Sequence, residues 1–310
     1  MCSSDLNSAN DFAVAYYQQE NPQDNYCFSP YSLFSGLSLA YLGAEGETAI
    51  GMEKGLHLTL SKKELAFSLE RVKETSLFEG EYMLKMADAL WIEKDIQLKE
   101  DYLFGANVER LPLNAKDPKG SSNAINQWVE EKTAGKISHL VAKEEITKDT
   151  KLLLTNALYF QDRFLSPFNH KNTKQKPFLD EMTEMMEQTN SFPYYEDEML
   201  QLLITPMASE KYGCFFLLPK GPLKELEKGL SSLEKIPFST EETRVHIELP
   251  KFSINMKSKP KASLTKLGME EAFSLQANFS GITDDAKLKI DEVLHEALFE
   301  LSEEIGRAHV

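Results

Sequence analysis

Two periods of hydrophobic and polar residues run along this chain, and together they predict a mixture of helices and strands. Apolar residues spaced three and four apart indicate helices, and this spacing recurs over residues 7–19, 30–42, 47–56, 64–77, 121–134 and 223–230. Alternating or continuous apolar runs indicate strands, and they cover residues 82–92, 152–160, 201–205, 212–218, 243–252 and 287–301. Helices and strands do not alternate one by one, so the pattern predicts an α+β fold.

The predicted helix at residues 30–42 carries both a start and a stop signal. Ser29 supplies a capping hydroxyl, and Pro30 suits the first helical position. Gly43 follows the last apolar residue and is expected to end the helix in a left-handed conformation.

Two polar residues interrupt predicted strands that are otherwise apolar. Asn156 lies within the run at residues 152–160, and His295 falls on the apolar face of the strand at residues 287–301. A buried polar group without a partner costs about 1–3 kcal/mol. Taken singly, each residue is expected to be satisfied by neighbouring backbone groups.

Composition limits the classes of partner. The chain has 310 residues, of which 42% are hydrophobic, so it can form a large core in one large domain or two smaller ones. Its formal net charge of −15 argues against a nucleic-acid or anionic membrane partner, because both attract clusters of Lys and Arg. No apolar run approaches the ~18 residues of a membrane span.

Residues that carry chemistry are sparse. Three cysteines, Cys2, Cys27 and Cys214, form neither a disulfide framework nor a metal-ligand spacing. The sequence contains no nucleophile-elbow, zinc-protease, redox-dithiol or phosphate-loop motif. We therefore expect a protein that is not an enzyme and that holds no metal or other cofactor.

Four stretches resemble, in the same order, motifs of the serpin family, whose inhibitory members present a bait loop to a protease. They are Cys-Phe-Ser-Pro-Tyr-Ser-Leu from residue 27 with Tyr-Leu-Gly-Ala-Glu-Gly-Glu-Thr-Ala from residue 41, Ile-Asn-Gln-Trp-Val-Glu from residue 125 with Thr-Ala-Gly-Lys-Ile from residue 133, Leu-Thr-Asn-Ala-Leu-Tyr-Phe from residue 154, and Val-Leu-His-Glu-Ala from residue 293. The resemblance implies a single α+β serpin domain with a large central mixed sheet and about eight or nine helices. The reactive loop and the last C-terminal strands of that fold are expected to be missing here.

The resemblance also implies a polar cluster beneath the middle of the large sheet, called the shutter, where two strands part to admit a third. Its motif positions are Ser29, Ser32, Asn156 and His295. A polar network there can exchange hydrogen bonds between two arrangements, whereas a tightly packed apolar core resists such movement.

A second implied group is the hinge at the end of the last strand. Lys251 is expected to pair with Glu303, and Glu304 is the only other hinge residue that remains. Taken alone, Lys251 and Glu303 would be solvated charges, and an exposed pair contributes only about 0–1 kcal/mol. Asp162 and Phe164 stand where the family usually has a glycine and a tryptophan. We expect Asp162 to keep the left-handed turn of that glycine. Phe164 keeps an aromatic ring at the sheet opening but lacks the indole N–H of tryptophan.

The two ends of the chain resemble a translated sequencing adapter. Residues 1–6 match one strand sense of that adapter, and residues 305–309 match its reverse complement. We therefore predict one incomplete domain over residues 7–304, with residues 1–6 and 305–310 foreign to it.

The function implied by the resemblance is inhibition of a serine or cysteine protease as a suicide substrate. The protease would cleave the reactive loop, form an acyl-enzyme and be trapped as the loop inserts between residues 152–160 and 288–301 of a metastable native state. The target protease is the expected partner, and the full-length protein is expected to be a monomer. The chain as printed has no reactive bond, so it is predicted to be inactive and, with unpaired sheet edges, prone to aggregate.

Two alternatives stay open at this point. One is a serpin without inhibitory activity that acts as a carrier or chaperone, which a bulky hinge would reveal. The other is an enzyme of unrelated fold, which the missing catalytic motifs disfavour. No secretory signal is visible at the start of the sequence, and both an extracellular and a cytoplasmic location remain open.

Overall fold

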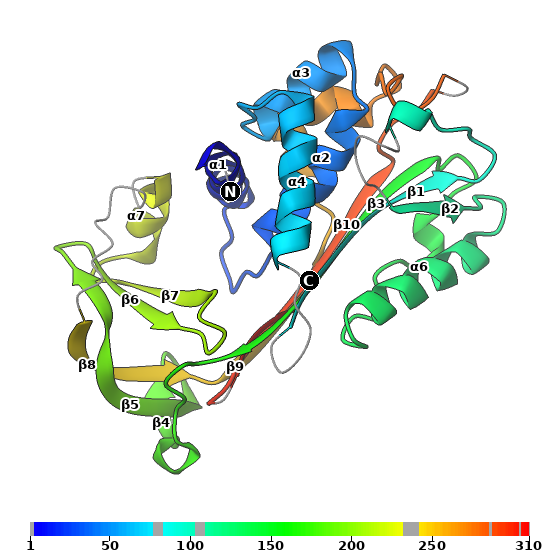
Figure 1. Ribbon diagram of the computed structural model, residues 1–310. Coiled ribbons are helices and arrows are strands. Elements are labelled where there is room, and N and C mark those ends of the chain that lie inside the picture. The colour runs from blue at the N-terminus through cyan, green and yellow to red at the C-terminus, as the bar shows by residue number, and fades with distance from the viewer. Residues whose placement is uncertain are drawn as a thin grey trace.

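The structure is a computed structural model that describes residues 3–76, 83–102, 109–231, 242–284, 287–303 and 305–309. Its elements form a large mixed sheet, helices on both faces of that sheet, and a second sheet at one end (Figure 1). The predicted α+β class is confirmed. Of the predictions above, Cys2, Glu304, the last residue of the helix predicted at 64–77, the first of the strand predicted at 82–92, and residues 1 and 310 of the two ends lie outside the described ranges.

Six strands form the large sheet, in the order β2-β1-β3-β11-β10-β9. Their bounds are β1 (Met83–Glu93), β2 (Glu109–Leu113), β3 (Leu152–Arg163), β9 (Phe252–Ser258), β10 (Glu292–Leu301) and β11 (Ile305–His309). The strands β1 and β3 are antiparallel neighbours. The strands β3 and β10 are parallel and pair directly over residues 153–155 and 292–294.

Helices cover both faces of this sheet (Figure 1). On one face lie α1 (Ser3–Glu20), α2 (Pro30–Leu42), α3 (Gly46–Gly55), α4 (Lys62–Ser76) and the short α8 (Lys261–Leu264), with η4 (Thr265–Met269) and η5 (Glu270–Phe273). On the other face lies α6 (Pro118–Lys132), followed by η1 (Lys143–Glu145).

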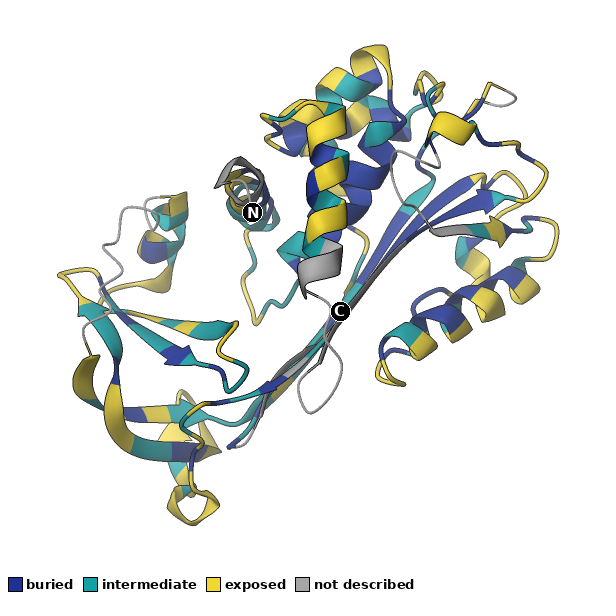
Figure 2. Ribbon diagram, in the orientation of Figure 1, coloured by how far each residue is buried: buried dark blue, intermediate teal, exposed yellow. Residues whose placement is uncertain are grey.

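Strand periodicity explains why the two faces have separate cores. Along β3, the side chains of Leu152 and Leu154 pack into the core beneath α2, while Leu153 packs into the core beneath α6. A strand that is covered on both faces reads as a continuous apolar run, as residues 152–154 do. Figure 2 shows these central strands as buried and the outer faces of the helices as exposed.

The second sheet follows the path β4-β5-β6-β7, and β8 pairs with β5. Its bounds are β4 (Lys174–Phe178), β5 (Glu181–Glu196), β6 (Leu200–Pro206), β7 (Gly213–Pro219) and β8 (Glu242–Pro250), with η2 (His170–Asn172) before it and α7 (Leu223–Lys228) after β7. A third core joins the two sheets and includes Phe164, Met186, Ile247 and Leu301.

Two predicted strands differ from the structure by more than three residues or in their number of strands. Residues 243–252 are not one strand: β8 ends at Pro250 in the second sheet, and β9 begins at Phe252 in the large sheet. Residues 287–291 precede β10, which begins at Glu292. The strands β2, β4, β5, β9 and β11 were not predicted as strands. In β5, the longest of them, many exposed polar residues leave little alternation to recognise.

The prediction of a left-handed cap at Gly43 is wrong. Its φ is −99°, and its backbone N–H donates to the carbonyl of Ala40 at 3.1 Å. The absence of a side chain serves packing instead, since a Cβ at Gly43 would lie 2.2 Å from Cγ1 of Ile282. The glycine therefore allows a distant loop to pack against the end of α2.

Candidate functional site

The large sheet forks between β3 and β10. The two strands pair directly only where residues 153–155 face residues 292–294, and the last such pair is Thr155 with Leu294. Farther along, β11 lies between them and pairs with residues 159–163 of β3 and 298–301 of β10. Direct pairing thus gives way to a space one strand wide.

Asn156 and His295 are the next residues along the two strands after the last direct pair. Thr155 faces the α6 side, where its hydroxyl accepts a hydrogen bond from Nε1 of Trp91 at 2.7 Å. Because successive side chains alternate between faces, Asn156 and His295 point the opposite way, toward the start of α2. The shutter positions on the strands therefore lie at the fork.

The start of α2 binds the histidine directly. The backbone N–H of Ser29 donates to Nε2 of His295 at 3.0 Å. Ser29 also caps the helix, as predicted, because its Oγ accepts from the N–H of Ser32 at 3.3 Å. One capping residue thus connects α2 to β10.

Asn156 packs against the middle of the same helix. A Cβ at Gly36 would lie 1.9 Å from Nδ2 of Asn156, so only a glycine leaves room for this amide. A glycine inside a helix costs about 1 kcal/mol relative to alanine. A glycine in the middle of a predicted helix is therefore a sign of close packing, and the sequence analysis overlooked it. Gly36 belongs to the site because it allows α2 and β3 to approach each other.

The hydrogen bond from Ser29 fixes the tautomer of His295. Since Nε2 accepts, the ring proton of the neutral imidazole lies on Nδ1. The side chain is fully buried, and this burial lowers the pKa of His295 to about 4, so the ring is neutral at pH 7. Among the described residues, neither Nδ1 of His295 nor Oγ of Ser32 has a hydrogen-bond partner, which leaves unused bonding capacity at the fork.

The hinge residues meet at the end of β10. Nζ of Lys251 lies 3.2 Å from Oε2 of Glu303, so the structure brings together the pair that the resemblance implies. Oε1 of the same carboxylate accepts from Oγ1 of Thr173 at 2.7 Å and lies 3.4 Å from Nδ1 of His170. The N–H of Phe168 donates to the carbonyl of Glu303 at 3.0 Å.

Glu303 is buried rather than solvated, because the segment from Phe168 to Thr173 covers it; only 2% of its side chain is exposed. Burial opposes ionisation, but the hydrogen bond from Thr173 and the pairing with Lys251 outweigh it, and the pKa of Glu303 lies below its ordinary value. Sequence reasoning missed Thr173 and His170, since no local pattern connects either of them to Glu303, which lies at least 130 positions farther along the chain.

The left-handed turn predicted at Asp162 does not exist. Asp162 continues β3 and has no positive φ. Its buried carboxylate accepts from the N–H of Arg163 at 2.7 Å and from the N–H and hydroxyl of Ser209, so it fastens the turn between β6 and β7. Phe164 is buried and packs edge to face against Phe168, with ring centroids 5.5 Å apart, at the junction of the two sheets.

The strand β11 is built from residues that we predict to be foreign to the domain. Its pairing with β3 and β10 involves backbone groups that every residue except proline carries. The predicted boundary at residue 304 therefore stays a prediction.

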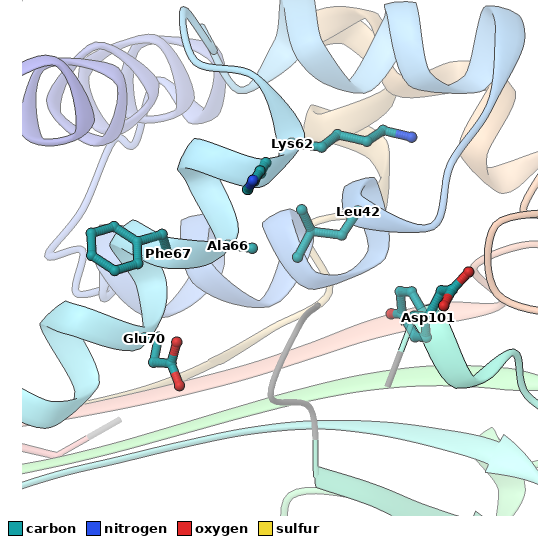
Figure 3. A pocket seen from close by; sticks show the side chains of 8 residues that line it. Leu42, Lys62, Ala66, Phe67, Glu70 and Asp101 are labelled. Carbon is teal, nitrogen blue, oxygen red and sulfur yellow. The ribbon is translucent and has the colours of Figure 1, made fainter. Parts of the chain in front are cut away.

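A surface pocket of about 350 Å³ lies between the end of α2, α4 and the segment at Asp101 and Tyr102 (Figure 3). Lys62, one of the side chains from α4, already bonds to the carbonyl of Ala44 and pairs with Glu45 at 3.0 Å. None of the residues that line the pocket belongs to the fork or the hinge, so it is separate from both.

Neither a metal site nor a membrane-spanning helix is found among the described residues. Within the described ranges, no three His, Cys, Asp or Glu side chains gather in a way that could hold a metal ion. Over those residues there is also no helix with the length and apolar character needed to cross a bilayer.

Comparison with known proteins identifies the family of this chain. The family model for Serpin (serine protease inhibitor) matches residues 7–309. An uncharacterized serpin-like protein of Methanosarcina mazei is 33% identical over 322 residues, covering 97% of this chain and 75% of that protein. Leukocyte elastase inhibitor of Bos taurus is 30% identical over 327 residues, covering 96% of this chain and 86% of the inhibitor.

A solved structure is similar over the same extent. Thyroxine-binding globulin complexed with thyroxine-fluorescein has a TM-score of 0.89 and 25% identity, covering 98% of this chain and 96% of that one. The fold is that of the serpins, and the chain belongs to the serpin family. This family includes protease inhibitors, such as the elastase inhibitor above.

Proposed function

We propose that this chain comes from a serpin that inhibits a protease by inserting its cleaved reactive loop between β3 and β10. The fork is the observation that supports this proposal. Direct pairing of the two strands ends at Thr155 and Leu294, and farther along them a third strand, β11, fits between β3 and β10. The target is expected to be a serine or cysteine protease.

The chemistry belongs to the protease. Its nucleophile attacks the scissile carbonyl of the loop, the peptide bond breaks, and the new amine end leaves while the carbonyl side stays attached as an acyl-enzyme. Insertion of the attached loop then has to precede hydrolysis by water. The serpin contributes a strand and a sheet, and no catalytic side chain.

Backbone hydrogen bonds supply the free energy that favours insertion. In β11, five residues face β3 and four face β10. At about 1 kcal/mol net for each backbone hydrogen bond, a strand of about ten residues gains on the order of 10 kcal/mol. Only the three direct pairs between residues 153–155 and 292–294 have to separate to admit it.

The shutter residues support the same proposal. Insertion past the fork requires β10 to move relative to α2, and the bond between Ser29 and His295 is the connection that must shift. Nδ1 of His295 and Oγ of Ser32 are available to form new hydrogen bonds in a second arrangement. We assign Ser29, Ser32, Asn156 and His295 to this rearrangement.

The hinge residues complete the proposal. Lys251, Thr173 and His170 surround the carboxylate of Glu303 at the point where the chain leaves β10. We assign them the role of fixing the first residues of the loop, so that insertion begins at one place. Phe164 and Leu301 belong to the same core beneath this point.

A carrier function is the second candidate, and the likeness to thyroxine-binding globulin favours it. That protein shares the fold with this chain, so the fold alone does not separate an inhibitor from a carrier. The composition of the hinge after Glu303 distinguishes an inhibitor from a carrier. A run of small residues permits insertion, whereas charged or proline-containing residues prevent it.

The test begins with recovery of the gene beyond the codon for Glu304 and expression of the complete product. It should be incubated with trypsin-like, chymotrypsin-like, elastase-like and subtilisin-like serine proteases and with a papain-like cysteine protease. An inhibitor forms a complex with one of them that survives denaturing electrophoresis. Cleavage with no such complex, or no reaction with any of them, refutes the proposed mechanism.

A further inference from the structure

The carboxylate of Glu303 meets two basic side chains that differ in how their charge depends on pH. Nζ of Lys251 lies 3.2 Å from Oε2, and Nδ1 of His170 lies 3.4 Å from Oε1. Lysine stays charged at neutral pH, whereas histidine is the side chain whose charge ordinarily changes between about pH 5 and 8. One contact to Glu303 is therefore permanently charged, and the other depends on a proton.

The geometry at His170 suits an ion pair better than a contact with a neutral ring. The separation of 3.4 Å lies beyond the ordinary range of N–H···O hydrogen bonds, about 2.7–3.2 Å. The hydroxyl of Thr173 already donates to the same oxygen, Oε1, at 2.7 Å. A neutral imidazole thus adds little, while a charged one adds a Coulombic attraction to a carboxylate that is almost completely buried.

The charges around Glu303 leave room for a second cation. Lys251 is shared, because its Nζ also lies 3.6 Å from a carboxylate oxygen of Glu184 on β5. Two carboxylates (−2) and one ammonium (+1) carry a net charge of −1. Lys171, the other cation of η2, is exposed beside His170. A proton on His170 brings the group of buried and paired charges to neutrality.

The carboxylate and the imidazole titrate under different conditions. Burial opposes ionisation of Glu303, but the hydrogen bond from Thr173 and the pairing with Lys251 outweigh it and keep the pKa of Glu303 below its ordinary value. Glu303 is thus still ionised at about pH 5.5. The side chain of His170 is 63% exposed, so protons from the solvent reach its ring. In mild acid both partners of the pair carry their charges.

These contacts hold the point where the chain leaves β10. The N–H of Phe168 donates to the carbonyl of Glu303 at 3.0 Å, so both the backbone and the side chain of Glu303 are bound by the segment that follows β3. Two residues after Glu303, β11 begins at Ile305, which pairs with Arg163 at the end of β3. The contacts at Glu303 therefore fix the root of a strand that lies between β3 and β10.

We propose that His170 is a pH-dependent positioning residue of the hinge, because its protonation adds a second ion pair to Glu303 and holds the inserted strand more firmly in mild acid. This inference rests on the proposed function and deepens it, since it names acidity as a condition that prolongs the trapped state. The contribution is present while the ring of His170 is charged and is lost as the pH rises.

A double-mutant cycle measures the ion pair in the chain itself. Urea unfolding at about pH 5.5 and about pH 8.0 compares the natural chain with His170→Gln, Glu303→Gln and the double variant. His170→Gln should lower the equilibrium constant for folding about threefold at the lower pH, as expected for a partly exposed pair, and leave it unchanged at the higher pH. In the Glu303→Gln background the same change should have no effect. His295 is present in all four proteins, so its titration cancels.

Two further variants keep the test independent of Glu303→Gln. His139→Gln removes another exposed histidine and should change neither equilibrium constant. His170→Arg keeps a cation at both pH values, so it should match the natural chain in mild acid and exceed it about threefold at the higher pH. A purely structural role of the imidazole predicts instead that glutamine and arginine cause the same loss at both pH values, and that result would overturn the proposal.

The consequence for the trapped protease is measured on the complete gene product. Its complex with the susceptible protease among the five used above is isolated, and the release of active protease is followed at the same two pH values. In mild acid the complex of His170→Gln should decay about threefold faster than the natural complex, whereas at the higher pH the two should decay alike. Each comparison is made at one pH, so the pH dependence of the protease cancels.

The outcomes separate this proposal from the proposed function. Coupling between His170 and Glu303 in mild acid, together with the faster decay of the variant complex, supports both. Absence of coupling overturns the role of His170, and a complex that still forms leaves the inhibitor. Coupling with equal decay of the two complexes overturns the effect on the trapped state. Coupling with no complex from any protease supports the ion pair and overturns the trap.

Discussion

Acid should weaken this fold through His295, and a substitution at that position isolates the effect. The pKa of His295 is lowered to about 4 by burial, while an unfolded histidine titrates near its ordinary 6.5. Between these values the unfolded chain binds a proton that the folded chain excludes. The free energy of unfolding therefore falls as the pH decreases from 6.5 to 4, and this group has no effect above 6.5.

The magnitude follows from the gap between the two pKa values, which corresponds to about 3 kcal/mol over the whole window. About 2 kcal/mol of that is lost between pH 6.5 and 5, before most carboxylates titrate. The cause is specific: Nε2 already accepts the N–H of Ser29 at 3.0 Å, so a proton there breaks this bond and places a charge in the core.

The assay compares the natural chain with His295→Gln in urea unfolding at four pH values between 4.5 and 7.5. Glutamine does not titrate, so the stability advantage of histidine should shrink by about 2 kcal/mol from pH 6.5 to 5. His139→Gln is the matched control, because it removes an exposed histidine and leaves the fork intact. Parallel curves for the natural chain and His295→Gln would refute the burial argument. If unfolding is irreversible, unfolding rates replace equilibrium values.

Three further changes test other contacts, with the unfolding free energy from urea titration as the measurement. Gly36→Ala should lower the free energy of unfolding by about 1–2 kcal/mol, although alanine has the better helix propensity. Adding Asn156→Ala should recover most of that loss. Additive effects of the two changes would show that the two residues do not touch. Lys251→Ala should lower the free energy of unfolding by about 1–3 kcal/mol, because it leaves the buried Glu303 carboxylate without the Lys251 cation. In a Glu303→Gln background the same change should cost little. A loss below about 0.5 kcal/mol in the natural chain would mean an ordinary surface pair. Asp162→Ala should destabilise by about 2–3 kcal/mol because three donors lose their acceptor, whereas a negligible loss would mean that water replaces the carboxylate.

Local chemistry predicted some of this site, and long-range packing decided the rest. The cap at Ser29 was predictable, because a hydroxyl before a proline is a helix start in any context. The buried positions of Asn156 and His295 followed from the apolar runs around them. The fork did not, since no local pattern sets the register between Thr155 and Leu294, which are 139 positions apart in the chain.

The errors have the same origin. Gly43 carries the composition of a helix cap, but its φ of −99° shows that packing against Ile282 determined the residue. Glu303 reads as a surface charge until the segment from Phe168 to Thr173 folds over it. In both cases a local preference lost to a contact between distant segments.

The position of the fork gives a physical reason for polar residues at the proposed shutter positions. Below it, β3 and β10 meet through residues such as Leu154 and Val293, which pack into the core beneath α2 and resist separation. At the fork itself His295 is held by a hydrogen bond from the start of α2, and such a bond can be exchanged for another. A strand that advances from the hinge therefore meets an exchangeable boundary before it meets the apolar pairs. Replacing His295 by leucine should make that boundary apolar, so we expect slower insertion by the complete protein together with a native state that acid no longer weakens at this position.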